Sequence, residues 1–340
     1  MFALRSVRIA ALLVFAFWLV PQCLLAQIQV QDVTFTDEFH GWVLLTQPTS
    51  SLFRTSDGGR SWVRFPLTVN KGFYLIRFLD ANTGLGIQPT STDEVTVYRT
   101  TDGGQNWRNV TSIKERYLSV TDLRFIGPDE ALMTGESEGR GWVAELYGKG
   151  RTLHVRHDLP LDLETQSTQG ILDGGDGHLW IVGKQFILHS ADNGGSWENQ
   201  APNAAPPIDL GLAGVALPGG RAWFAAGNFD IYRTEDYGKH WIRAHSTTNE
   251  GGTTFHGISF LSVSDGCAVG NSSFIYCTSD GGVTWHRTRV FKKFPRDSQL
   301  RPWSKLFLFN SGSGWASVNG SLYKTVDRGK SFNNAVGLLK

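Results

Sequence analysis

One eight-residue pattern recurs along this chain and constrains its fold more than any other feature. The first copy runs from Thr55 to Trp62, with an aspartate at its third position and a glycine at its fifth. Further copies begin at Thr100, Ser190, Thr234, Thr278 and Thr325, and the last has phenylalanine in place of tryptophan. We call this pattern the octet. Its repetition predicts an array of one structural unit.

The spacing of the octets gives the number of units. Their aspartates, separated by 45, 90, 44, 44 and 47 residues, are Asp57, Asp102, Asp192, Asp236, Asp280 and Asp327. The step of 90 equals two periods and predicts a degenerate copy near residue 147. There Gly148 replaces the aspartate and Leu153 the tryptophan, while Gly150 and Thr152 keep their positions. Seven repeats of about 45 residues have the length of propeller blades.

Each octet is interpreted as a tight hairpin turn. The aspartate carboxylate can accept hydrogen bonds from backbone N–H groups just ahead of it. The glycine can adopt a positive φ at little cost. This structural interpretation is preferred to the chemical alternative, in which the octets bind calcium or supply a catalytic carboxylate.

Four short runs fill each repeat. In the first repeat they are residues 30–35, 41–44, 52–54 and 61–65. They are apolar, aromatic or β-branched and are separated by turn residues, as strands are, and no segment has a helical period. The sequence therefore predicts an all-β, seven-bladed propeller with four antiparallel strands per blade. The octets form the hairpins between third and fourth strands.

A cross-strand pair is expected beside each octet. The residue before the octet is often basic, at Arg54, Arg99, Arg233 and Lys324. The facing position on the preceding strand is often large and apolar, at Trp42, Leu85, Trp180, Phe224 and Trp315. A cation over an aromatic ring is a modest structural interaction. In the sixth repeat Cys267 and Cys277 occupy these two positions, so a disulfide is favoured over two buried thiols.

The amino terminus is typical of a secretory signal. Arg5 and Arg8 precede an apolar run over residues 9–20, and Ala26 offers a small residue for cleavage. The run is short for a membrane span. We expect an exported protein with a signal at residues 1–26 and one propeller domain at residues 27–340; a retained anchor is the alternative. Without two signal arginines the charge is 30 − 31 = −1, which gives no case for nucleic-acid binding.

The octets, with a Tyr-Arg or Phe-Arg pair before them and a Gly-Trp strand upstream, resemble Asp-box (BNR) repeats. The whole repeat most resembles the photosystem II assembly factor family of seven-bladed propellers, over nearly all of residues 28–340. This resemblance implies an exported protein with no enzymatic activity and no cofactor, which binds an assembly intermediate through a basic surface. The third repeat departs from the pattern, and the fourth has His189 in place of the arginine.

A carbohydrate-active protein, either a glycosidase or a lectin, is the alternative function, because sialidases and xyloglucan hydrolases share the Asp-box. The arginine signature of sialidases is missing, and the nearest string is Phe294-Pro295-Arg296. A xyloglucan hydrolase needs two carboxylates across a cleft between two propellers. No metal site is expected, since His154 and His157 would point to opposite faces of a strand and no Cys/His cluster has zinc spacing.

The partner surface is predicted in the loops that join one blade to the next. Residues 287–305 carry seven basic side chains, one acidic side chain and interleaved aromatic rings. Arginine beside aromatics is typical of protein interfaces; the alternative is a solvated loop. Arg77 and Arg124 either line the channel mouth or pair with neighbouring carboxylates. The candidate partner-binding residues are Arg77, Arg116, Tyr117, Arg124, Lys292, Lys293, Arg296, Arg301 and Trp303.

Overall fold

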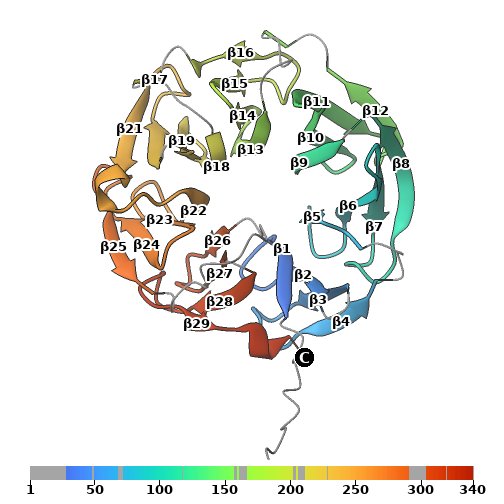
Figure 1. Ribbon diagram of the computed structural model, residues 1–340, viewed down its shortest axis with the longest axis horizontal. Coiled ribbons are helices and arrows are strands. Elements are labelled where there is room, and N and C mark those ends of the chain that lie inside the picture. Colours follow the sequence, from blue (N-terminus) through green and yellow to red (C-terminus); the bar gives the residue numbers. More distant parts are fainter. Residues whose placement is uncertain are drawn as a thin grey trace, which may run out of the picture.

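Seven antiparallel sheets stand around a central axis in the computed structural model (Figure 1). The structure describes residues 28–47, 50–67, 72–116, 118–156, 159–160, 167–201, 204–205, 211–227, 229–290, 304–318 and 320–339. Within them, each sheet uses strands that are consecutive in the chain, so the predicted all-β, seven-bladed propeller is confirmed. The predicted signal at residues 1–26 lies outside the described residues.

The first three blades each contain four strands. Blade 1 consists of β1 (Gln29–Phe35), β2 (Gly41–Gln47), β3 (Ser51–Thr55) and β4 (Val63–Pro66). Blade 2 consists of β5 (Leu75–Phe78), β6 (Gly84–Ser91), β7 (Glu94–Thr100) and β8 (Arg108–Lys114). Blade 3 consists of β9 (Ser119–Gly127), β10 (Glu130–Ser137), β11 (Arg140–Tyr147) and β12 (Thr152–Val155).

The remaining blades follow the same order. Blade 4 consists of β13 (Thr168–Gly175), β14 (His178–Gly183), β15 (Phe186–Ser190) and β16 (Glu198–Asn199). Blade 5 consists of β18 (Gly211–Leu217), β19 (Arg221–Ala226), β20 (Asp230–Thr234) and β21 (Trp241–Ser246). Blade 6 consists of β22 (Phe255–Phe260), β23 (Gly266–Gly270), β24 (Phe274–Thr278) and β25 (His286–Arg289). Blade 7 consists of β26 (Lys305–Leu308), β27 (Gly314–Val318), β28 (Ser321–Thr325) and β29 (Asn333–Asn334).

Two features depart from four strands per blade and all-β content. A short fifth strand, β17 (Ala204–Ala205), pairs in parallel with the outer strand of blade 5. The described residues also include 3-10 turns at η2 (Thr248–Glu250) and η3 (Val336–Leu338).

The core lies between neighbouring sheets. Second strands are the most buried, and all five residues of β27 are inaccessible, whereas all four residues of the outer strand β25 are exposed. The ring of Trp42 in blade 1 stacks on Phe78 of blade 2 with centroids 3.7 Å apart. Trp223 of blade 5 stacks on Phe260 of blade 6 at the same distance. Large flat rings therefore supply much of the apolar area that joins one blade to the next.

The expected cross-strand pair forms beside the octets. Arg54 lies opposite Trp42, with its guanidinium carbon 5.9 Å from the ring centroid, and Lys324 lies 5.0 Å from the ring of Trp315. In blade 5 the residue opposite Arg233 is Trp223 rather than Phe224. The prediction was wrong by one position, and one position on a strand moves a side chain to the other face of the sheet.

One member of this cross-strand pair also binds the octet of the next blade in blades 1, 5 and 7. The Trp42 indole N–H donates to the carbonyl of Gly103 at 2.9 Å, and the Trp223 indole N–H donates to Gly281 at 3.0 Å. The Lys324 ammonium donates to the carbonyl of Gly58 at 2.7 Å, across the junction of blades 7 and 1. We call this contact the inter-blade latch.

Blade 3 builds its latch differently. The predicted degenerate octet forms the hairpin between β11 and β12, and Glu145 occupies the position of the basic residue. Arg156 pairs with Glu145 at 2.6 Å and donates to the carbonyls of Gly194 and Gly195 in blade 4. Both charged side chains are only 6% exposed. Arg156 thus supplies from the end of the blade the cation that the octet has lost.

In blade 6 a disulfide occupies the latch position. Cys267 and Cys277 are directly opposed on β23 and β24, with their Cα atoms 4.1 Å apart, and their sulfurs are bonded. The bridge packs on the next octet, because a Cβ on Gly329 would lie 3.3 Å from the sulfur of Cys267. A Cβ on Gly59 would likewise lie 2.1 Å from the ring of Trp315. The fifth octet position therefore needs glycine for close packing as well as for its positive φ.

The octet aspartate closes its own turn. The Asp57 carboxylate accepts the backbone N–H groups of Arg60 and Ser61 and the hydroxyls of Thr55 and Ser61, at 2.6–3.0 Å. The aspartates of the other five octets also accept backbone and hydroxyl donors of their own turns. The pKa of all six carboxyl groups is lowered.

These lowered pKa values predict acid sensitivity. The backbone N–H of Ser196, with the hydroxyls of Ser190 and Ser196, lowers the pKa of Asp192 from 3.8 to about 2. Because the folded pKa lies below the unfolded value, this stabilisation is complete above about pH 4 and is lost as the pH falls through the folded pKa. We expect the melting temperature to drop by about 5 °C or more between pH 6 and pH 3, measured by circular dichroism. Asp192→Asn should be less stable at pH 6 and lose less on acidification. An unchanged melting temperature would contradict this role of the octets.

Among the described strands, the ring closes without exchanging a strand between its ends. Blades 1 and 7 each consist of their own four strands. The N–H of Val30 donates to the carbonyl of Gly320 at 2.9 Å, and the ring of Trp315 stacks on Phe35 with centroids 5.6 Å apart. Leu339, after η3, packs in the same cluster as Val30. Figure 1 shows blades 1 and 7 side by side, with the carboxyl end of the chain between them.

Candidate binding surfaces and the axial channel

The propeller presents two faces with different loops. Because successive strands are antiparallel, the connections alternate between the faces. The entry face carries the loops between blades and the loops between second and third strands, which contact one another where the N–H of Glu115 donates to Asp93. The octet face carries the octets and the loops between first and second strands, which meet where the N–H of Gly58 donates to Phe39.

Four charged residues of alternating sign line one side of the axial channel. They lie on the innermost strands β26, β1, β5 and β9 and are Lys305, Asp32, Arg77 and Asp122. The Arg77 guanidinium lies 3.1 Å from Asp32 and 2.6 Å from Asp122, and the Lys305 ammonium pairs with Asp32. We call this set the axial charge chain. It joins blades 7, 1, 2 and 3.

Backbone donors complete the axial charge chain. Asp32 also accepts the N–H of Ile76 in the next blade at 2.9 Å, and Asp122 accepts the N–H of Ile171 in its own next blade at 3.1 Å. Burial opposes the charge of Arg77, but the carboxylates of Asp122 and Asp32 outweigh burial and raise the pKa of Arg77. Burial also works against ionised Asp122, yet Arg77 and Lys305 lower its pKa. The carboxylates thus favour the charged form of Arg77, and Arg77 and Lys305 favour the charged form of Asp122. Burial and the neighbouring Arg77 lower the pKa of Lys305.

The structure separates the described members of the predicted partner site. Arg77 belongs to the axial charge chain, and Arg124 lies 3.5 Å from Asp173 on β13. Arg116 lies on the entry face, 3.3 Å from Glu138, whereas Arg124 is three residues from the octet-face end of β9. These three arginines do not form one surface, and each has a carboxylate partner. The other candidates lie outside the described residues: Tyr117, Lys292, Lys293, Arg296, Arg301 and Trp303.

The described start of the basic run combines guanidinium groups with an aromatic ring. The guanidinium carbons of Arg287 and Arg289 lie 5.0 and 5.9 Å from the ring centroid of Phe274. Arg287 also lies 3.4 Å from Glu250 of η2. Sequence analysis did not identify Phe274. Its pairing opposite Arg289 across the β24–β25 hairpin is the feature that could have revealed it.

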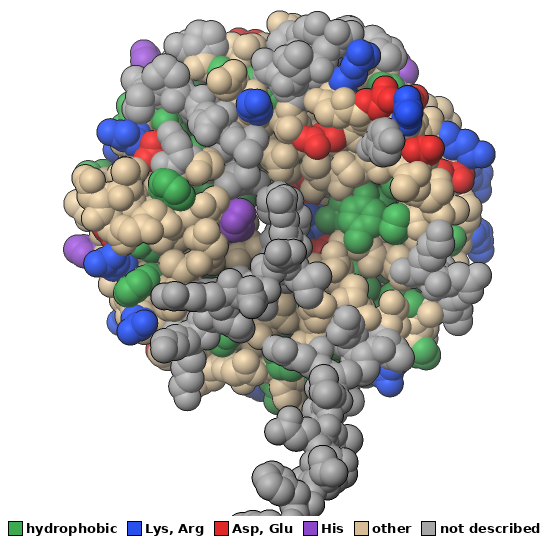
Figure 2. Space-filling view, in the orientation of Figure 1, with side chains coloured by type: hydrophobic (Ala, Val, Ile, Leu, Met, Phe, Trp, Pro, Cys, Tyr) green, Lys and Arg blue, Asp and Glu red, His purple; other side chains and the backbone are tan. Residues whose placement is uncertain are grey.

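Basic and acidic side chains are mixed over the face of the propeller that Figure 2 draws. Figure 2 shows Lys and Arg side chains spread around the rim and interspersed with acidic ones, not gathered in one patch. Across the described residues no cluster of three or more His, Cys, Asp and Glu side chains is arranged to hold a metal ion. The described part of the chain also contains no helix with the length and apolarity to cross a membrane.

Several known proteins are similar in sequence to this chain over most of its length. No protein-family model matches. The photosystem II assembly lipoprotein Ycf48 of Prochlorococcus marinus (strain MIT 9313) is 29% identical over 258 residues, which cover 62% of this chain and 73% of that protein. Ycf48 of Picosynechococcus is 26% identical over 294 residues, covering 72% and 82%. The chloroplast photosystem II stability/assembly factor HCF136 of Arabidopsis thaliana is 22% identical, covering 69% and 60%.

Solved structures share the fold. A structure described as YCF48 bound to D1 peptide has a TM-score of 0.63 at 18% identity and covers 89% of this chain and 94% of that one. An ancestral GH74 enzyme has a TM-score of 0.65 at 15% identity and covers 91% of this chain but 46% of the enzyme. Sequence relatives carry the more specific signal, because such structural likeness extends to proteins of different function. The chain is therefore a homologue of the photosystem II assembly factors Ycf48 and HCF136.

Proposed function

We propose that this chain is an exported, non-catalytic propeller that binds a protein partner during the assembly of a membrane protein complex. Its homologues carry the names of photosystem II assembly factors, and one protein of this fold was solved with a D1 peptide. By homology, the partner is a segment of a photosystem II membrane protein. The apolar segment at residues 9–20 supports export.

The pairing of the carboxylates in the axial charge chain favours a binding protein over a glycosidase. Hydrolysis of a glycosidic bond requires one carboxyl group as acid and another as nucleophile or base, both open to the sugar. In the described channel wall, Asp32 and Asp122 are each paired with Arg77 and bonded to backbone N–H groups. Both carboxylates are therefore occupied by protein donors, and the lowered pKa of Asp122, caused by Arg77 and Lys305, makes that group a poor general acid. This arrangement supports a non-catalytic function, although the GH74 fold likeness keeps glycan binding as the second candidate.

The partner contact is proposed on the entry face beside blade 6. Arg287 and Arg289 flank Phe274 there, and the sequence continues into Lys292, Lys293 and Arg296. Guanidinium groups held against an aromatic ring lose little conformational freedom on binding, and they attract acidic segments. The proposed contact thus includes the basic run at residues 287–305 that sequence analysis identified. It does not include Arg77, because Asp32 and Asp122 already pair with its charge.

Charge reversal tests the proposed contact. The triple variant Lys292→Glu, Lys293→Glu and Arg296→Glu should reduce partner capture by about tenfold or more, because each reversal replaces attraction with repulsion. Capture is measured by crosslinking in cells and mass spectrometry. The matched control reverses three exposed basic residues of blades 2 and 3, Arg108, Lys149 and Arg151. Equal capture by both variants and by the unmodified protein would reject the site. Hydrolysis of a glycan by the purified protein would reject the function itself.

A further inference from the structure

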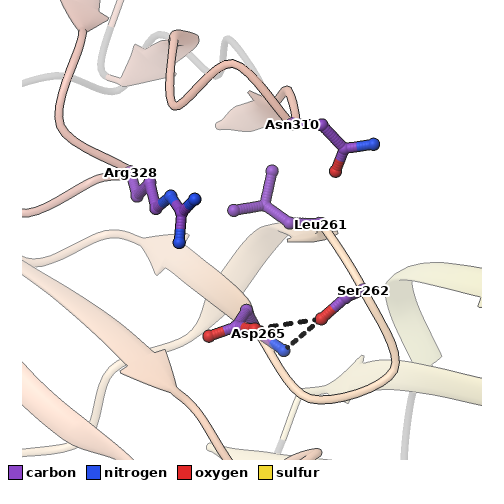
Figure 3. A pocket seen from close by; sticks show the side chains of 5 residues that line it. All are labelled: Leu261, Ser262, Asp265, Asn310 and Arg328. Atoms are coloured by element: carbon purple, nitrogen blue, oxygen red, sulfur yellow. Dashed lines mark hydrogen bonds between the residues drawn. The ribbon is translucent and has the colours of Figure 1, made fainter.

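A small polar pocket opens on the octet face between blades 6 and 7 (Figure 3). Its volume is about 130 Å³, and it is lined by Leu261, Ser262, Asp265, Asn310 and Arg328. The first three residues come from the loop between β22 and β23, Asn310 comes from the equivalent loop of blade 7, and Arg328 belongs to the octet of blade 7. Pockets for small molecules usually exceed about 300 Å³, so this one suits a single side chain.

Arg328 occupies the fourth position of its octet. The fourth octet residue has a left-handed conformation in every blade; Gly58, Gly103 and Gly281 adopt it in three other blades, and Lys149, Asn193 and Tyr237 in the remaining three. Arg328 has φ 61° there, a conformation that costs a non-glycine residue more than it costs glycine. Within the described residues its guanidinium has no hydrogen bond or ion pair, and Figure 3 shows it directed toward the pocket beside Leu261. Its guanidinium is therefore available to a ligand that enters the pocket.

Asp265 supplies a hydrogen-bond acceptor and a negative charge to the same pocket. One of its carboxylate oxygens accepts the hydroxyls of Ser262 at 3.0 Å and Ser264 at 2.8 Å, and the other has no partner among the described residues. In the described part of the chain Asp265 forms no ion pair with Arg328. The pocket is therefore lined by an exposed donor, Arg328, and by an acceptor, Asp265, that Ser262 and Ser264 hold in place.

Exposed apolar side chains accompany the pocket. Val263 is 50% exposed in the same loop as Ser262, and Val326 is 71% exposed two residues before Arg328. Other large apolar residues exposed in described loops of this face are Phe39, Leu79, Tyr237 and Val283. On the described part of the entry face the comparable residue is Leu338 of η3, which is 46% exposed. Apolar side chains around a polar pocket are typical of a surface that binds protein.

We propose that the pocket binds the carboxamide of an asparagine or glutamine side chain in an extended protein segment, whose aliphatic neighbours lie on Val263 and Val326. The carboxamide oxygen accepts from the Arg328 guanidinium, and the carboxamide N–H donates to the free oxygen of Asp265. A carboxylate at this position is repelled by Asp265, and an ammonium group by Arg328. This inference rests on the proposed protein-binding function but assigns a second contact, on the other face.

Short peptides test the specificity. Three capped pentapeptides, Gly-Val-X-Val-Gly with glutamine, glutamate or lysine at X, are titrated into the full chain labelled with ¹⁵N. Chemical-shift changes at residues 261–265, 310–312 and 326–328 report binding. We expect the glutamine peptide to bind at least about fivefold more tightly than the other two, because only it satisfies both walls of the pocket. Equal affinities, or shifts confined to other residues, would overturn the proposal.

Two variants separate binding from folding. Arg328→Gly should weaken the glutamine peptide by about tenfold or more, while its melting temperature stays the same or rises by about 2 °C because the strain is removed. Asp265→Asn should raise the affinity for the glutamate peptide, since the repulsion is gone. Unchanged binding by Arg328→Gly rejects the pocket. Partner capture in cells is measured independently, so failure of the pocket leaves the proposed assembly function standing.

Discussion

Asp32→Ala is expected to lower the free energy of unfolding by about 3–5 kcal/mol, because it leaves buried positive charge without its partner. The Asp32 side chain is 3% exposed and contacts both Arg77 and Lys305. It also accepts the N–H of Ile76, which joins blade 1 to blade 2. The substitution therefore weakens two junctions, between blades 7 and 1 and between blades 1 and 2. Urea denaturation measures the loss in free energy of unfolding.

A surface ion pair provides the matched control. Asp129 lies 3.5 Å from Arg99 and its side chain is 50% exposed. Asp129→Ala should change the free energy of unfolding by less than about 1 kcal/mol, since solvent screens such pairs. If Asp32→Ala were no more destabilising than Asp129→Ala, the axial charge chain would have no special part in closing the ring. Asp32→Ala combined with Lys305→Met should recover part of the loss, because one unpaired charge is removed as well.

Arg156→Ala is expected to have a similar effect, about 3–5 kcal/mol, at the junction of blades 3 and 4. It leaves Glu145 buried without a counter-charge and the carbonyls of Gly194 and Gly195 without their donor. Denaturation by urea, followed by tryptophan fluorescence, measures the change.

A second substitution distinguishes the inter-blade latch from simple charge burial. Adding Glu145→Arg to Arg156→Ala recreates the arrangement of the other blades, in which a basic residue precedes the octet and, in blade 5, Arg233 lies 3.4 Å from the carbonyl of Gly281. The double variant should recover most of the lost stability. A variant with Glu145→Gln and Arg156→Ala removes the buried negative charge but leaves the carbonyls of Gly194 and Gly195 without a cationic donor. It should therefore recover less of the lost stability. Equal recovery by both would show that the carbonyls of blade 4 need no donor.

The fold was predictable because its signal repeats. Each octet alone is a short turn, but seven of them at one period can only belong to one unit used seven times. Even Gly148 and Leu153, which lack the octet's chemistry, lie in the hairpin that the spacing required. The error at Phe224 was local, since nothing in the sequence distinguishes it from Trp223 when both are large and aromatic.

The sites were less predictable because their partners come from other blades. Arg77 was identified as a candidate contact, yet its carboxylate partners Asp32 and Asp122 lie 45 residues away on either side. Arg156 replaces a missing cation, but only the position of the next octet in space reveals this. Arg328 did carry a signal in the sequence, as an arginine where three octets have glycine. Its significance depends on the pocket beside it, which the sequence does not reveal.

Blades 1 and 7 share no strand among the described residues, and this has a consequence for how such a ring can vary. Every sheet is completed by neighbours in the chain, and blades 7 and 1 meet through Lys305, Lys324 and Trp315 rather than through a borrowed strand. No blade is therefore obliged by connectivity to come first. If the two ends were linked and the backbone opened between any other pair of blades, all seven hydrogen-bonded ladders would survive unchanged, so circular permutation by whole blades is compatible with this architecture.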